Sequence, residues 1–156
     1  MSEREQQKDL FTRRWRGVRL PDPKEHELQI EVVTMLRWCL RPDVIMRHVP
    51  NGELRDKRTA AKLRAMGVLP GSADLEFFWK DYWENSEGSH TAFAALFLEL
   101  KRPGGKLSEE QVAFALAVRL AGAEFEVVTS VDGAIDAVGR RHLIRPDVEV
   151  CGRRWT

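Results

Sequence analysis

An apolar segment that ends in two charges constrains the fold of this chain more than any other feature. Residues 94–98 read Ala-Ala-Leu-Phe-Leu, and Glu99 and Lys101 follow on either side of Leu100. The segment predicts a central strand over residues 91–101. Residues two apart on a strand point to the same face, so Glu99 and Lys101 would lie together. Charges on so apolar a strand are costly to bury unless they are paired or bind a metal, which marks a candidate site.

An aspartate upstream can join these two charges. Asp74 follows a Pro-Gly turn and precedes a strand predicted over residues 75–79. We expect this strand to pair with the central strand as a hairpin, with residues 80–90 as the loop at its tip. That pairing would bring Asp74 beside Glu99.

The oxygen atoms of this group suit a divalent cation. The carboxylates of Asp74 and Glu99 and the backbone carbonyl of Leu100 are hard ligands of the kind that bind Mg²⁺ or Mn²⁺. Such an ion would polarise a phosphate and lower the pKa of an attacking water, and Lys101 would add a compact positive charge. This chemistry hydrolyses a nucleic-acid backbone. The alternative interpretation is a Glu–Lys surface pair on an edge strand.

The order of predicted elements favours an α/β fold, with a mixed sheet flanked by helices in a single domain. The elements are a helix that opens at Asp22-Pro23 and ends before Pro42, a strand over 43–49, a basic helix over 59–66, the strands over 75–79 and 91–101, a helix over 109–120 capped by Ser108, a strand over 124–129 and a helix over 132–138. We expect residues 1–20 to form a polar, flexible leader, residues 21–140 the folded domain and residues 141–156 a basic extension.

Composition limits the classes of function. The chain has 156 residues and a formal net charge of +1, so a nucleic-acid partner must be inferred from local charge clusters. Cys39 and Cys151 make no disulfide framework; Cys39 is expected in the core. The four histidines lack zinc-ligand spacing. The N-terminus does not resemble a signal peptide, and no apolar run is long enough to span a bilayer. We therefore expect an intracellular protein that binds no membrane.

Positive charge gathers locally. One cluster follows Asn51 and consists of Arg55, Lys57, Arg58, Lys62 and Arg64. Further arginines lie within residues 13–19 and 140–154. Each cluster has two interpretations, contact with DNA phosphates or a solvated protein surface, and the sequence does not decide between them.

Two polar residues of the predicted helices have both a structural and a functional interpretation. Gln111 stands three residues after Ser108, as in an S-x-x-Q capping box, but it can also face the metal site or a phosphate. Glu25 stands three residues after Asp22 and can complete a cap there. Glu25 also lies on the helix face expected to pack on the sheet, whereas Glu27 is expected to face solvent.

Four ordered motifs resemble those of the VRR-NUC nuclease family, a branch of the PD-(D/E)XK or restriction-endonuclease-like superfamily. They are residues 48–52 (HVPNG), 67–75 (GVLPGSADL), 99–101 (ELK) and 107–111 (LSEEQ), and the resemblance spans residues 23–138. It implies an α-β-β-β-α-β core, to which this chain would add one helix. The chain has Gly-Ser-Ala-Asp where the superfamily's name suggests Pro-Asp, which is usual for this family.

The resemblance assigns roles by position. It matches the motif aspartate to Asp74, the E-x-K pair to Glu99 and Lys101, the following glutamine to Gln111, and the acid of the first helix to Glu25, with Glu27 as the competing choice. Asn51 and the basic residues after it would hold the phosphate backbone.

We therefore expect a metal-dependent DNA endonuclease that selects branched or junction DNA by structure rather than by sequence. Its partners would be DNA and a second copy in a homodimer, because one active site cuts one strand. We expect no nucleotide cofactor, and a location in the cytoplasm of a bacterial or phage-infected cell. The alternative is a non-catalytic DNA-binding or recruitment module on the same fold, and an RNA-directed nuclease also stays open.

Overall fold

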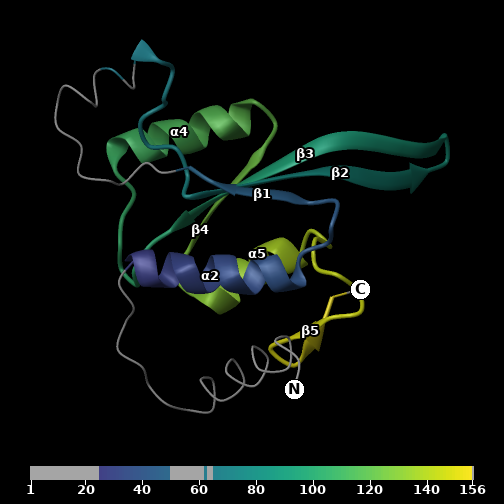
Figure 1. Ribbon diagram of the computed structural model, residues 1–156. Helices are drawn as coiled ribbons and strands as arrows, with labels where there is room; N and C mark the ends of the chain where they lie inside the picture. Colours follow the sequence, from purple (N-terminus) through teal and green to yellow (C-terminus); the bar gives the residue numbers. More distant parts are fainter. Residues whose placement is uncertain (1–24, 50–61, 63–64, 156) are drawn as a thin grey trace.

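The described part of the chain folds around a four-stranded sheet that has helices on both faces (Figure 1). The computed structural model describes residues 25–49, 62 and 65–155, apart from the side chain of Glu25. Its elements in chain order are α2 (Glu25–Cys39), β1 (Ile45–His48), β2 (Leu75–Asn85), β3 (Gly88–Leu100), α4 (Glu109–Leu120), β4 (Glu124–Val128), α5 (Val131–Gly139), β5 (Glu149–Val150) and β6 (Arg153–Arg154).

The sheet is mixed, with the strand order β1-β2-β3-β4. The pairs β1–β2 and β2–β3 are antiparallel, whereas β4 lies parallel to β3. A parallel neighbour needs a crossover connection, which α4 supplies. The order α2-β1-β2-β3-α4-β4 confirms the predicted α/β class and the α-β-β-β-α-β core. The helix predicted over 59–66 and the cap predicted at Asp22-Pro23 lie mostly outside the described residues.

The two faces of the sheet carry separate apolar layers. The main core lies between the sheet and the helices α2 and α5, and α4 covers the opposite face (Figure 1). In β3, Leu96, Leu98 and Leu100 are fully buried in the main core. Because side chains alternate along a strand, Phe97 and Glu99 face α4. The candidate site therefore lies on the α4 side of the sheet.

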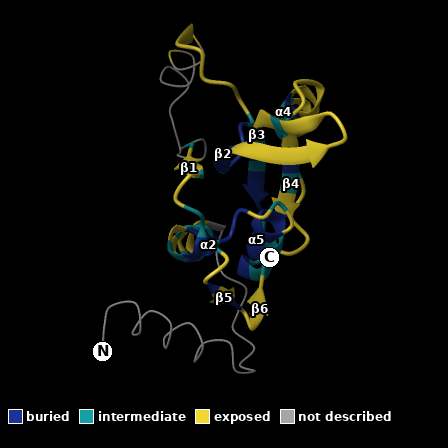
Figure 2. Ribbon diagram, turned by 90° about the vertical axis from the view of Figure 1, so that its right-hand side faces the viewer, coloured by how far each residue is buried: buried dark blue, intermediate teal, exposed yellow. Residues whose placement is uncertain are grey.

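The strands β2 and β3 continue past the rest of the sheet as an antiparallel ribbon. The predicted loop over residues 80–90 is wrong, because pairing continues unbroken to Asn85 and Gly88. Phe78 stacks on Phe93 across the ribbon, with ring centroids 5.8 Å apart. Most ribbon side chains are exposed (Figure 2), so their composition resembles that of a loop.

The helix predicted over residues 109–120 is confirmed at both ends. Ser108 caps α4, and Gly122, with φ of 84°, follows the turn that ends it. The strand predicted over 124–129 and the helix predicted over 132–138 agree with β4 and α5 to within a residue at each end.

The segment after residue 140, which we expected to be a basic extension, also contributes to the main core. Its buried side chains are Leu143, Ile144, Val148 and Val150. The hairpin of β5 and β6 was not predicted, because two-residue strands show no periodicity.

Cys39 is the core thiol that the sequence predicts. It is fully buried, and desolvation raises its pKa to about 12. No helix in the described ranges is long and apolar enough to cross a membrane.

Candidate active site

Glu99 and Lys101 form a buried ion pair at the end of β3. Lys101 Nζ lies 2.6 Å from Glu99 Oε1, and the side chains of Lys101 and Glu99 are 13% and 1% exposed. The strand that carries them lies between β2 and β4, so the surface pair on an edge strand is the wrong interpretation. A carboxylate this deeply buried requires compensating partners, and Lys101 is one of them.

Asp74 reaches the same place from the beginning of β2. Leu75 pairs with Leu98 in the β2–β3 register, so the chain just before β2 meets the end of β3. Asp74 Oδ2 accepts a hydrogen bond of 2.8 Å from the backbone N–H of Leu100. The structure thus brings Asp74 and Glu99 together, as the hairpin argument predicts.

Gln111 completes the predicted capping box and also contacts Glu99. Its backbone N–H donates to Ser108 Oγ over 3.2 Å, and its Oε1 accepts from the Ser108 backbone N–H over 2.9 Å, which completes the capping box. Its Nε2 donates to Glu99 Oε1. The two roles are compatible because they use different atoms of one side-chain amide.

The close approach of α4 to the site depends on Gly71. This residue has φ of 73°, in the region that favours glycine. A Cβ atom there would lie 2.5 Å from the carbonyl oxygen of Glu110 and 2.6 Å from the backbone nitrogen of Gln111. The sequence indicates the Pro-Gly turn but not its contact with α4. It reveals neither the φ of Gly71 nor which helix packs against this residue.

His48 links β1 and α2 to the backbone of Asp74. Its Nδ1 lies 2.8 Å from the Asp74 carbonyl oxygen and 2.7 Å from the Gln29 side-chain amide. The Gln29 atom is Nε2, which donates, whereas the carbonyl oxygen only accepts, so the tautomer of His48 decides which of the two contacts is a hydrogen bond. The backbone N–H of Val49 also donates to the Asp74 carbonyl, over 3.2 Å. Sequence reasoning placed His48 in a motif but gave it no role.

The atoms gathered here suit a divalent cation chemically. Among the described residues, no three or more His, Cys, Asp or Glu side chains cluster as a metal site. The predicted ligand set needs only two carboxylates, from Asp74 and Glu99, and the Leu100 carbonyl. All three are oxygen donors, as Mg²⁺ and Mn²⁺ prefer.

Several predicted site residues lie outside the described part of the chain. They are the side chain of Glu25 and the residues Asn51, Arg55, Lys57 and Arg58. Glu27 is exposed, as expected, and Lys62 is exposed as well. The roles proposed for these residues stay predictions.

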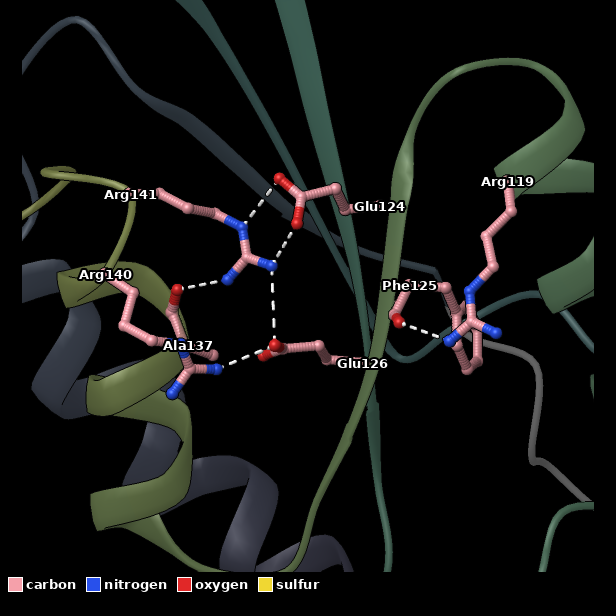
Figure 3. Close-up of polar contacts among 7 residues, drawn as sticks. All are labelled: Arg119, Glu124, Phe125, Glu126, Ala137, Arg140 and Arg141. Atoms are coloured by element: carbon pink, nitrogen blue, oxygen red, sulfur yellow. Dashed lines mark hydrogen bonds and ion pairs between the residues drawn. The ribbon is translucent and has the colours of Figure 1, made fainter.

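Two arginines from the C-terminal cluster contact acids within the protein (Figure 3). Arg141 Nε donates to Glu124 Oε1 over 2.9 Å, and Arg140 pairs with Glu126 at 2.7 Å. These contacts connect the end of α5 to β4. They give both arginines a structural role, and contact with phosphate stays a prediction for the cluster.

The fold is similar to that of a solved structure described as a "VRR_NUC domain protein". The TM-score is 0.56 and the sequence identity 20%, and the match covers 78% of this chain and 89% of that chain. This likeness confirms the fold that the four motifs predict. No protein-family model matches the sequence, and no curated protein matches it.

Proposed function

We propose that this chain is a nuclease of the VRR-NUC type that hydrolyses phosphodiester bonds in DNA with Mg²⁺ or Mn²⁺. The observation that carries the proposal is the environment of the Glu99 carboxylate. Glu99 is 1% exposed, lies beside Asp74, and binds both Lys101 and Gln111 through one oxygen. The Gln111 amide would stabilise a buried structural ion pair as well, but such a pair does not require a second acid beside it, whereas a metal site uses several carboxylate oxygens.

Each of these residues has a defined task in the proposed reaction. The bound metal would polarise the phosphate and supply a water of lowered pKa. Asp74, Glu99 and the Leu100 carbonyl would hold it. Lys101 would place its positive charge beside the attacked phosphate and orient the water. Gln111 would keep the Glu99 carboxylate in one orientation, and Glu25 would support the site from α2.

The substrate and assembly follow from the same proposal. Backbone contacts through Asn51, Arg55, Lys57, Arg58 and Lys62 would carry little sequence information, which favours selection of a DNA structure such as a branch. Symmetric cutting of two strands would need a homodimer, because each copy carries one site.

The test is cleavage of linear, flapped and four-way DNA in Mg²⁺, Mn²⁺ or EDTA. Wild type would be compared with Asp74→Ala and Lys101→Ala, and with Asp147→Ala as the control. Asp147 is a surface acid whose carboxylate lies 4.0 Å from Arg145. We expect the two site variants to lose about 100-fold or more in rate and the control to retain it.

Three results would count against the proposal. Unchanged cleavage by both site variants would remove the catalytic assignment. Binding of DNA by wild type with no cleavage in either metal would favour the non-catalytic module, and preferential cleavage of RNA would change the substrate class. Melting temperatures would verify that each variant is folded.

A further inference from the structure

A second buried acid, Glu76, lies on β2 two residues beyond Asp74. It is 5% exposed, although it has no part in the proposed metal site. Residues two apart on a strand share a face, so Glu76 points to the same side of the sheet as Asp74 and Glu99. Its position opposite Phe97 would suit an apolar side chain, which would avoid the cost of burying a charge.

The partner of Glu76 is an arginine on β1. Arg47 pairs with Glu76 in the strand register, and its Nε lies 2.5 Å from Glu76 Oε2. The Arg47 guanidinium also lies over the Phe78 ring, 5.4 Å from the centroid. The Arg47 side chain is nevertheless 62% exposed. The protein thus holds an exposed guanidinium by an ion pair with a buried acid and by a contact over the face of an aromatic ring.

This arrangement places positive charge next to the candidate site. Arg47, Glu76 and Phe97 form one cross-strand row, and the next row on this face contains Asp74 and Glu99. Diagonal neighbours on adjacent strands lie about 7–8 Å apart, so the Arg47 backbone is about 8 Å from that of Asp74 and, two strands across and one row along, about 12 Å from that of Glu99. Phosphates recur about every 3.4 Å of helix axis along one DNA strand. A strand with one phosphate at the acids therefore has a neighbouring phosphate within reach of Arg47.

We propose that Arg47, oriented by Glu76, binds a backbone phosphate next to the one that is cleaved. A guanidinium binds phosphate through a planar fork of N–H donors, and fixing its orientation reduces the entropy lost on binding. Both cations pair with an acid, but Lys101 is 13% exposed whereas Arg47 pairs through Nε and stays 62% exposed, so Arg47 is the cation that an approaching polyanion can reach. The inference rests on the proposed function for the identity of the ligand as nucleic acid.

The chain offers a closely matched control in Arg153. Its guanidinium also pairs with an acid, Asp136, at 2.9 Å, and lies 5.7 Å from the centroid of the Trp155 ring. Its side chain is 54% exposed. Arg153 lies on β6, in the C-terminal hairpin rather than on the sheet that carries the site.

The experiment measures binding to a fluorescent four-way DNA by anisotropy, in EDTA and across a salt series. We expect Arg47→Ala to reduce the magnitude of the slope of log K against log salt by about 1, which corresponds to the loss of one phosphate contact. Arg153→Ala should leave the slope unchanged. Arg47→Lys should retain the slope but bind more weakly, because it keeps the charge and loses the fork. Glu76→Gln should weaken binding in the wild-type background and have no further effect when Arg47 is already alanine.

The outcomes separate this inference from the proposed function. An unchanged slope in a folded Arg47→Ala protein, or an equal effect of Arg153→Ala, would overturn the inference while cleavage by wild type still supported the nuclease. An additive effect of Glu76→Gln on top of Arg47→Ala would overturn the positioning role. Absence of DNA binding by wild type would overturn the inference, and absence of cleavage in Mg²⁺ and Mn²⁺ as well would overturn both.

Discussion

At the scale of single residues, the site is organised around one oxygen atom. Glu99 Oε1 receives both the Lys101 ammonium and the Gln111 amide. The charge of a carboxylate that is 1% exposed is thereby compensated, and its orientation is defined from two directions. Gln111 is the only one of these three residues that also closes a helix cap, so it couples the position of α4 to that of the acid.

Substitutions of Gln111 can separate its two roles. Glu at this position keeps an oxygen for the Ser108 N–H but replaces the donor to Glu99 with a second negative charge. We expect Gln111→Glu to lower kcat/KM in Mn²⁺ by about 100-fold or more, because like charges in contact in a buried site repel strongly. Gln111→Ala removes both roles, and loss of a cap also costs about 1 kcal/mol of stability.

Steady-state kinetics and thermal unfolding of both variants check this prediction. Ser108→Ala is the control for the cap alone, since it leaves the Gln111 side chain in place. If Gln111→Glu cleaves as well as wild type, Gln111 acts only as a helix cap.

At the scale of elements, the loop before β2 and the first turn of α4 pack closely because Gly71 has no side chain. Gly71→Ala would force a Cβ atom to 2.5 Å from the Glu110 carbonyl oxygen at a φ of 73°. We expect Gly71→Ala to lower the free energy of unfolding by more than about 2 kcal/mol. Strain at positive φ adds to the backbone clash, and each contributes on the order of 1–3 kcal/mol. Cleavage should fall with it, because α4 carries Gln111.

Gly104→Ala is the matched control for Gly71→Ala. Gly104 has a similar φ of 79°, but a Cβ atom there would have nothing within 4 Å. Gly104→Ala should lower the free energy of unfolding only through backbone strain, by roughly 1 kcal/mol. Equal losses of stability for the two variants, measured by urea unfolding, would show that contact with α4 is unimportant.

The contacts of β4 with α5 predict a dependence of stability on pH. The pKa of Glu124 lies below its usual value of 4.5 because Arg141 donates a hydrogen bond to its carboxylate, which outweighs desolvation (Figure 3). A carboxyl group whose pKa is lowered by folding stabilises the protein above its unfolded pKa. That contribution is lost as the pH falls through the folded value.

We therefore expect Glu124→Gln to lower the melting temperature at pH 7, and the difference from wild type to shrink progressively as the pH falls below 4.5 and the carboxylate of wild type is protonated. Glu149→Gln is the control, since the Glu149 carboxylate lies 4.0 Å from Arg154 at the surface. A difference between wild type and Glu124→Gln that stays constant with pH would contradict the role of this ion pair.

The elements also show what one sequence can and cannot predict. The bounds of α4 were predictable because Ser108 and Gly122 mark its ends locally. The β2–β3 ribbon was missed because its polar exposed side chains carry the composition of a loop. Asp74 and Glu99 could be brought together by strand pairing alone, whereas the Gly71 contact and the His48 bond depend on tertiary packing.

At the scale of the whole molecule, the candidate oxygen donors come from the two open ends of the β2–β3 hairpin, which only the folded sheet holds together. Asp74 precedes β2, and Glu99 and Leu100 end β3. A cation bound to all of them would bind the folded chain and not the unfolded one, so it would stabilise the protein by mass action. Metal binding should therefore be measurable as stability, independently of any cleavage.

We expect the melting temperature of wild type to rise by roughly 5–10 °C when free Mn²⁺ reaches 100 times its Kd, because about 2.7 kcal/mol of binding energy shifts a domain of this size by that amount. Asp74→Asn should abolish most of the rise while its amide oxygen still accepts the Leu100 N–H, so its stability without metal should stay near that of wild type. Asp147→Asn, which changes a surface acid, should retain the full rise. A shift of the same size in Asp74→Asn would place the cation elsewhere, and the metal role of Asp74 would then be wrong even if the protein cuts DNA.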